Sequence, residues 1–532
     1  MNNYPTGFAR AIIVITTISA AIMELIDTSI VNVALTKISG NIGVTIEDVS
    51  WVITAYAIAN VIIIPMTGFL GEYFGRKNYY LVSMIVFTVA SYFCGASTGL
   101  FELVAWRFIQ GIGGGALLST SQAILFDAFP PEKRAIAGGL FGMGIVLGPT
   151  LGPTVGGLIL DNFENWGYIF YVNIPIGIIA TYLTLTFIDK KEGEGKKKDS
   201  IKIDYTGILL LMVGVGCLQY VLERGEAEDW FSSPLIRNAG IAALIGVAVF
   251  IWHELRIKNP VVNLHVLNNR TLAITTIFTF TSGIGLFTSV YIYPVLAQRI
   301  LGFTPLMTGL ALLPPTIIGI IMFPIIGKKM STGASPMPFI IIGLLFFIAF
   351  GWFGGQVNGE VERWDFFMPL AFRALGMSML QLPLITASVA GLQPKDYASG
   401  ISLNNMSRQL GGAFGIAISN NYIAHQYAQH RTDLVSNINM SSADFTNRLN
   451  TITQSITART GEVVSIATEK AYKLIDLQVD KQAYLLSYLD TFRLISIFFI
   501  IVFPLVFFLK LKPQPKSDKT LKEKASAISE AH

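Results

Sequence analysis

The sequence predicts an all-α polytopic membrane protein. Of its 532 residues, 52% are hydrophobic and only 14% are charged, and the mean hydropathy is +0.57. This balance lies outside the range of soluble globular domains. In addition, fourteen separate apolar runs are each long enough to cross about 30 Å of hydrocarbon. We therefore expect 14 transmembrane helices.

The expected helices follow one another along the whole chain and are joined mostly by short loops. Their ranges are 11–35, 51–71, 79–98, 103–126, 136–160, 168–188, 205–223, 237–256, 271–297, 306–327, 337–354, 366–391, 399–424 and 490–511.

Lys and Arg gather in alternate loops. They occur at 76–77, 133–134, 190–202 and 256–270 and in the tail after 510, whereas the other loops are poorer in them. Because cytoplasmic loops carry an excess of positive charge, we expect a multi-pass protein of the cell (inner) membrane with both termini in the cytoplasm. The net charge of +4 then reports orientation rather than binding to nucleic acid.

Two longer segments divide the helices into parts. The charged segment 189–204 is expected to be a cytoplasmic linker. The segment 425–488 has apolar residues near helical spacing, which predicts an extracytoplasmic hairpin of two amphipathic helices. The expected parts are a six-helix bundle at 1–188, the linker at 189–204, two inserted transmembrane helices at 205–256, a second six-helix bundle with the hairpin at 257–511, and a cytoplasmic tail at 512–532.

Two carboxylates, Glu24 and Asp27, lie one turn apart in the first expected helix. An ionisable group within the membrane is costly, so it usually faces a cavity, pairs with a cation or carries a proton. Arg107, which shares a face of the fourth expected helix with Gln110, is the nearest candidate cation. Two interpretations stay open: a proton-binding site, or a fixed ion pair that only orients helices.

A row of glycines occurs in the fifth expected helix, one at every fourth position, with two prolines beside it. The residues are Gly144, Gly148, Gly152 and Gly156, with Pro149 and Pro153. Small residues at this spacing let membrane helices approach closely. The row is therefore either a plain packing face or a moving interface.

The loop between the second and third expected helices reads GFLGEYFGRK. Gly68 and Gly75 allow a tight turn, and the charges of Glu72 and Arg76 can bridge neighbouring helix ends. An ordinary positively charged loop is the alternative.

No pattern for catalysis or metal binding is present. Cys94 and Cys217 both lie in apolar runs, and there is neither a phosphate-binding GxxxxGK[ST] nor a GxSxG, an HExxH or a cluster of His and Cys. We expect no enzyme activity, no metal and no cofactor, so uphill transport would draw on an ion gradient.

Six motifs in the same order resemble the major facilitator superfamily, in particular its fourteen-helix drug:proton antiporter branch of the EmrB/QacA type. They are LIDTSIVNVAL at 25–35, GFLGEYFGRK at 68–77, RFIQG at 107–111, GIVLGPTLGPTVGG at 144–157, WGYIFYVNIPIG at 166–177 and SRQLGGAFGIAI at 407–418. The resemblance implies two six-helix bundles that rock around a central cavity, plus two inserted helices.

The resemblance also assigns roles to particular residues. It implies that Asp27 and Arg107, with Glu24, take part in proton coupling. It implies that the fifth helix seals against the opposite half, which we expect at Gly309, Pro314, Pro315 and Gly319 of the tenth. Glu72 departs from the family pattern, in which Asp is commoner.

Polar and aromatic residues on other expected helices suit a broad amphipathic cavity. These candidates for substrate contact are Tyr56, Asn60, Gln110, Tyr291, Tyr293, Gln381, Asn404, Asn405 and Arg408. Each has an alternative role in packing or in hydrogen bonds between helices.

The expected function is proton-coupled export of small, lipophilic and often cationic drugs. One alternative is a dedicated exporter of a single metabolite, lipid or siderophore, and another is a non-transporting membrane scaffold or sensor. The resemblance extends to Gram-negative pumps that work with a periplasmic membrane-fusion adaptor and an outer-membrane channel, and to QacA-like relatives that carry a similar hairpin without them. The sequence leaves both arrangements open.

Overall fold

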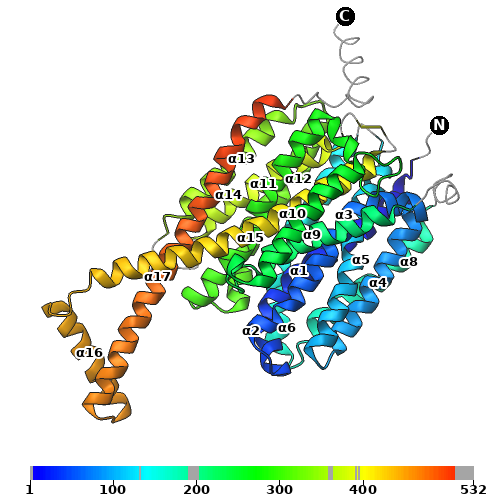
Figure 1. Ribbon diagram of the computed structural model, residues 1–532. Helices are drawn as coiled ribbons and strands as arrows, with labels where there is room; N and C mark the ends of the chain where they lie inside the picture. The colour runs from blue at the N-terminus through cyan, green and yellow to red at the C-terminus, as the bar shows by residue number, and fades with distance from the viewer. Residues whose placement is uncertain are drawn as a thin grey trace, which may run out of the picture.

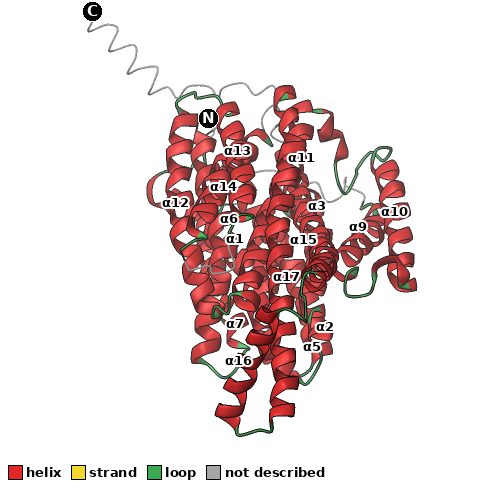
Figure 2. Ribbon diagram, turned by 90° about the vertical axis from the view of Figure 1, so that its left-hand side faces the viewer, coloured by secondary structure: helices red, strands yellow, loops and turns green. Residues whose placement is uncertain are grey.

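The computed structural model describes residues 4–130, 133–189, 203–357, 364–389, 392–393 and 396–509, and in these ranges the chain is a helical bundle without strands (Figures 1 and 2). Every predicted span coincides with a long helix. The long helices are α1 (Gly7–Ile42), α3 (Trp51–Phe74), α4 (Arg76–Ala96), α5 (Leu100–Asp127), α6 (Arg134–Asn162), α8 (Asn173–Phe187), α9 (Tyr205–Arg224), α10 (Pro234–Glu254), α11 (Arg270–Val295), α12 (Pro305–Ser331), α13 (Met337–Gly354), α14 (Phe367–Ala387), α15 (Tyr397–Ser436) and α17 (Val464–Val502).

Shorter helices complete the bundle. They are α2 (Ile46–Val49), α7 (Tyr168–Tyr171), η2 (Trp230–Ser232), η3 (Leu264–Asn268), the π-helical turn η4 (Leu296–Ile300), α16 (Ala443–Thr460) and η6 (Phe503–Phe508).

Among the described residues, 12 helical segments are long and apolar enough to cross a membrane. The helices α5 and α15 are not among them, although they have 28 and 40 residues. Both carry buried polar and charged side chains, such as Arg107 on α5 and Arg408 on α15, which lower their hydropathy. The number of 14 transmembrane helices therefore stays a prediction.

The helices pack in two groups that correspond to the two halves of the chain. In the first group α1 packs on α6, and α5 packs on both α3 and α4. In the second, α11 packs on α15, and α13 packs on both α14 and α17. Contacts of α6 with α12 and of α3 with α15 join the groups. The predicted linker at 189–204 and tail at 512–532 fall largely or wholly outside the described residues.

The pair α9 and α10 lies at the edge of the bundle, as Figure 2 shows. The two helices are packed closely, because a Cβ atom on Gly246 would meet Cα of Gly214 at 2.7 Å. On the side of the first group, Arg224 at the end of α9 donates to the Glu47 carbonyl at 2.8 Å and to Ser50 Oγ at 2.5 Å. The inserted pair is thus fastened to the start of α3.

The start of α1 and the end of η6 lie at one end of the bundle, and a helical projection extends from the other end (Figure 1). We call these the terminal end and the projecting end. The projection differs from the hairpin predicted at 425–488, because only α16 is a separate helix. Its other two parts are the continuations of α15, which runs to Ser436, and of α17, which begins at Val464.

Candidate functional site

The centre of the first group contains a buried ion pair between α1 and α5. Arg107 Nη1 donates to Asp27 Oδ2 at 2.5 Å, and the two side chains are 1% and 0% exposed. The structure therefore contains the ion pair that the sequence predicted. Since charges removed from water are stable only when they are well paired and hydrogen-bonded, the surroundings of the pair decide what it can do.

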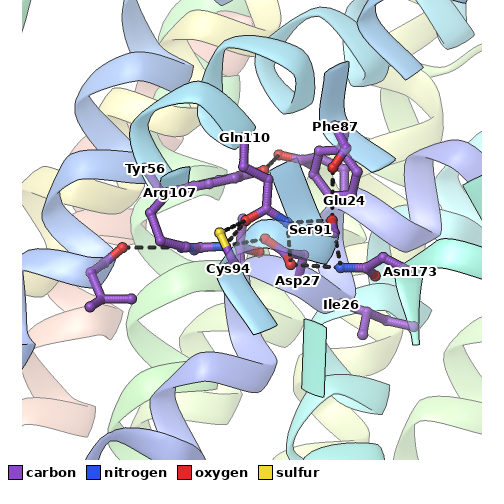
Figure 3. Close-up of polar contacts among 12 residues, drawn as sticks. Glu24, Ile26, Asp27, Tyr56, Phe87, Ser91, Cys94, Arg107, Gln110 and Asn173 are labelled. Atoms are coloured by element: carbon purple, nitrogen blue, oxygen red, sulfur yellow. Dashed lines mark hydrogen bonds and ion pairs between the residues drawn. The ribbon is translucent and has the colours of Figure 1, made fainter. Parts of the chain in front are cut away.

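Amide side chains satisfy the second carboxylate oxygen of Asp27. Gln110 Nε2 and Asn173 Nδ2 donate to Oδ1 at 2.9 and 2.8 Å, respectively. Gln110 also donates to Ser91 Oγ at 2.8 Å and accepts from Arg107 at 2.7 Å. Figure 3 shows this network, which draws on α1, α4, α5 and α8. Gln110 was predicted to line the substrate cavity, but here it belongs to the network around Asp27.

The guanidinium of Arg107 is held on its other sides as well. Its Nε donates to the Val52 carbonyl at 3.1 Å. Its Cζ lies 4.2 Å from the ring centre of Tyr56 and 5.5 Å from that of Phe170. Cation–π contacts of this kind strengthen when the cation is desolvated. Arg107 is therefore held in place whether or not Asp27 carries a charge.

Glu24 has a less complete set of partners than Asp27. Its Oε1 accepts from Asn60 Nδ2 at 3.0 Å and from the Tyr56 hydroxyl at 3.3 Å, whereas Oε2 has no hydrogen-bond partner among the described residues. The side chain is nevertheless only 3% exposed. A proton or a ligand donor can therefore be placed on Oε2 without breaking an existing bond.

A polar face of α15 meets the first group near Glu24. Asn405 Nδ2 donates to Ser119 Oγ at 3.1 Å and to Gln122 Oε1 at 3.2 Å, both on α5. Its own Oδ1 accepts from Arg408 at 2.8 Å, and Arg408 acts electrostatically on Glu24 of α1. The structure thus brings the predicted residues Glu24, Asn405 and Arg408 to the boundary between the groups.

The glycine row of α6 packs on α1 and not on the opposite group. A Cβ atom on Gly144 would meet Ile22 at 3.3 Å, and one on Gly152 would meet the Ser29 Cβ at 2.9 Å. Gly148 and Gly156 likewise face α1, at Leu25 and at Ile30. Pro149 and Pro153 lie inside the same uninterrupted helix. The row therefore supports the back of the helix that carries Glu24 and Asp27.

Other residues of α6 make the predicted contact with α12. Thr316 Oγ1 donates to Thr150 Oγ1 at 3.4 Å, and Gly309 lies against Thr154, where an added Cβ would be 2.7 Å from Cα. Gly319, by contrast, faces the carbonyl of Ala374 on α14. Pro314 and Pro315 lie inside α12. The expected partner helix is correct, but the glycine row is not the surface that meets it.

At the terminal end, Arg76 pairs with Asp127 at the end of α5. Glu72 is exposed and makes no ion pair among the described residues. Gly75 adopts φ 82° and joins α3 to α4, which is a left-handed backbone that favours glycine. The turn agrees with its prediction, whereas among the described residues the carboxylate that pairs with Arg76 is Asp127 and not Glu72.

Contacts between the two groups are also close at the terminal end. A Cβ atom on Gly68 would lie 3.2 Å from the backbone nitrogen of Ser399 on α15. Arg134 of α6 donates to the Tyr397 hydroxyl at 3.0 Å.

Several predicted cavity residues lie inside the second group. Tyr293 is fully buried, and its ring centre is 5.2 Å from that of Phe366. Gln381 donates to Ser282 Oγ at 3.3 Å, and Tyr291 contacts Asn420 of α15. These contacts join α11 to α14 and to α15 within the second group.

Asn173, Ser91 and Asp127 complete the networks but were not singled out from the sequence. Asn173 lies within the motif WGYIFYVNIPIG, and the sequence signal for Ser91 and Asn173 is an isolated polar position in an apolar run. Asp127 is distant from Arg76 along the chain, so no local pattern links them. In the described part of the chain, no group of three or more His, Cys, Asp or Glu residues could hold a metal ion.

Comparisons with known proteins agree on one family. A family model described as the Major Facilitator Superfamily matches residues 17–416. The multidrug export protein EmrB of Escherichia coli (strain K12) is 31% identical over 495 residues, which cover 92% of this chain and 93% of EmrB. The fatty acid resistance protein FarB of Neisseria gonorrhoeae is 31% identical over 510 residues, covering 96% and 98% of the two chains. The crystal structure of the human organic anion transporter MFSD10 has a TM-score of 0.59 at 14% identity and covers 94% of this chain and 100% of MFSD10, which shows a shared fold.

Proposed function

This chain belongs to the Major Facilitator Superfamily, and we propose that it is a proton-coupled multidrug exporter that moves lipophilic, often cationic compounds by alternating access. The observation that carries the proposal is the buried Asp27–Arg107 pair, one helical turn from a second carboxylate with a free oxygen. The relatives named as multidrug export proteins support the choice of substrate class.

The two carboxylates have different roles in proton coupling. Asp27 receives three hydrogen bonds, so its charge is compensated by Arg107 and by two amides. Glu24 Oε2 has no partner among the described residues, so a proton bound there meets no competing donor. A cationic drug pairs with the same Glu24 carboxylate when it is ionised. Proton and drug therefore compete at Glu24, and Asp27 responds through the helix that both residues share.

The helix α6 carries this response to the opposite group. One of its faces packs on the back of α1, and another meets α12 at Thr150 and Thr154. When α1 shifts on protonation, α6 has to move with it, because the small residues between them are packed in close contact. This movement changes the contact of α6 with α12 between the two groups. The Arg76–Asp127 pair holds the terminal end of α4 to α5.

The proposal places the protein in the cell (inner) membrane with both termini in the cytoplasm. The proton gradient supplies the energy, no cofactor takes part, and the chain catalyses no chemical change in its substrate. The two six-helix bundles are the moving units, and the α9–α10 pair is inserted between them in sequence. In a two-membrane envelope, the projection of α15, α16 and α17 is the part that reaches toward a periplasmic membrane-fusion adaptor and an outer-membrane channel.

A dedicated exporter of one lipid is a second candidate, because a relative over most of the chain is named for fatty acid resistance. A panel of unrelated dyes as competitors separates the two: a multidrug pump is inhibited by several of them, and a dedicated exporter by none.

The test is ethidium transport by the purified chain in proteoliposomes with an imposed pH gradient. We expect transport by the wild type, its loss in Asp27→Asn, and its loss in the wild type when a protonophore is added. Asp161→Asn, which changes an exposed carboxylate at the end of α6, is the matched control and keeps transport. Undiminished, gradient-dependent transport by Asp27→Asn would refute the role of the pair. Absence of flux in the folded wild type would favour a scaffold or sensor.

A further inference from the structure

Arg408 is a buried cation without a paired anion. Its side chain is 3% exposed, and its single hydrogen bond among the described residues runs to Asn405 Oδ1. No carboxylate of the described chain is within ion-pair distance of it. Arg107, which is equally buried, has Asp27 at 2.5 Å. A guanidinium removed from water without a paired anion is costly, so an anion that reaches this position would be bound favourably.

A second unused donor lies beside Arg408. Asn404 is 6% exposed, and its Nδ2 has no hydrogen-bond partner in the described part of the chain. Asn404 and Arg408 are four residues apart on α15, which places them on one face of the helix, one turn apart. An amide N–H and a guanidinium on one face are the donor set that binds a carboxylate, because a guanidinium offers parallel N–H groups to its two oxygens.

The orientation of Arg408 is fixed by its neighbours. Asn405 Nδ2 donates to Ser119 and Gln122 of α5, which leaves its Oδ1 to accept from Arg408. On the other side, Gly283 of α11 packs on the backbone of Arg408. The guanidinium is therefore held at the boundary between the groups, where substrates bind in the proposed function.

Glu24 does not remove the need for an anion. It acts on Arg408 electrostatically from α1, but it makes no ion pair with it and belongs to the opposite group. When Glu24 binds a proton or a cationic drug, its charge is no longer available to Arg408. The boundary thus has an acidic group at Glu24 and a basic group at Arg408, with the neutral donor Asn404 beside Arg408.

We propose that Arg408 and Asn404 form a subsite for the carboxylate head group of amphipathic anions, so that the exporter accepts lipophilic anions as well as cations. This inference rests on the proposed function, since it places the subsite between the two groups that exchange substrate. The apolar part of such a ligand lies along the surrounding membrane-spanning helices.

The experiment measures equilibrium binding of two probes, radiolabelled laurate and ethidium, to the full chain in lipid nanodiscs at pH 7.5. Laurate in water is ionised at this pH, because carboxyl groups have ordinary pKa values of about 4. Empty nanodiscs correct for partition into lipid. The readout is the ratio of the laurate affinity to the ethidium affinity, which is insensitive to a general loss of folded protein.

We expect this ratio to fall about tenfold or more in Arg408→Gln, which is the order expected for the loss of a charge-assisted hydrogen bond. Arg408→Lys keeps the charge but not the fork of donors, so its ratio lies between those of the wild type and Arg408→Gln. Asn404→Ala lowers the ratio about threefold, in line with one neutral hydrogen bond, and provides a second test if Arg408→Gln does not fold.

Arg373→Gln is the matched control. Arg373 is also 3% exposed and also makes no ion pair among the described residues, but it lies inside the second group, where it donates to Ser289 Oγ at 3.4 Å. This variant should leave the ratio at the wild-type value. A ratio that stays unchanged in Arg408→Gln and in Asn404→Ala, or laurate binding no stronger than that of empty nanodiscs, would overturn the subsite. If ethidium is neither bound nor transported by the wild type, the proposed function fails instead, so the two failures are distinguishable.

Discussion

The ion pair between Asp27 and Arg107 offers the sharpest quantitative test. The change is a double-mutant cycle that consists of Asp27→Asn, Arg107→Gln and the combination of the two. Each single change leaves one charge buried without its partner, since both side chains are at most 1% exposed. The combined change removes both charges and leaves neutral amides beside Gln110 and Asn173, which can bond to them.

The structure sets the size of the expected effect. Removal of one member of a buried pair typically costs about 3–5 kcal/mol in the free energy of unfolding, because an uncompensated charge stays behind. Neutral hydrogen bonds between membrane helices contribute only about 0.6 kcal/mol on average. The double variant should therefore be no less stable than either single variant, so the coupling energy is about 3 kcal/mol or more.

The assay is reversible unfolding of the purified protein in mixed micelles, followed by helix content, with ethidium transport measured in parallel. All three variants should lose gradient-driven transport, although the double variant regains stability. Additive destabilisation, with a coupling energy below about 0.5 kcal/mol, would show that the two charges do not stabilise each other. The Asp27–Arg107 contact would then not be a stabilising ion pair.

Further predictions concern the packing of α6, the charges at the terminal end and the second oxygen of Asp27. Gly152→Ala should destabilise the protein by about 1–3 kcal/mol through overpacking, because an added Cβ would clash with the Ser29 hydroxyl and lie 2.9 Å from the Ser29 Cβ. Gly40→Ala, with nothing within 4 Å, should have little effect in the same unfolding assay. Asp127→Asn should reduce the rate of ethidium transport more than Glu72→Gln does, since Asp127 is the carboxylate that pairs with Arg76, and equal rates would argue against this pair. Asn173→Ala should lower the free energy of unfolding by about 1–2 kcal/mol, because it removes a donor to the Asp27 carboxylate, and an unchanged unfolding curve would contradict that contribution.

The sequence alone predicted where the helices lie and which two buried charges pair. Each expected span coincides with a long helix, because crossing a membrane demands an unbroken apolar run that hydropathy detects without knowledge of packing. The pairing of Asp27 with Arg107 was predictable for a related reason. Few ionisable groups are tolerated inside a membrane, so each has few possible partners.

Contacts between distant segments were decided only by the tertiary structure. The glycine spacing in α6 indicates that another helix packs closely against this face, but it does not identify that helix. The structure shows that it is α1. Similarly, Arg76 had a carboxylate nearby in its own loop, at Glu72, yet it pairs with Asp127, 51 residues along the chain. At the projecting end, helical spacing of apolar residues correctly predicted helix within 425–488. It did not show that α15 and α17 continue into this segment, because the spacing is the same whether a helix is separate or an extension of its neighbour.

The same limit applies to the functional residues. Residue type alone identified Glu24 on the first expected helix, and Asn404 and Arg408 on the thirteenth, as polar positions in apolar surroundings. Whether a buried polar atom is satisfied depends on what lies within about 3 Å of it, which is a property of the folded chain. Only the structure shows that Asp27 is fully bonded while Glu24 Oε2 and Asn404 Nδ2 are free among the described residues. This difference between satisfied and unsatisfied groups, and not residue type, distinguishes the sites that can accept a proton or a ligand.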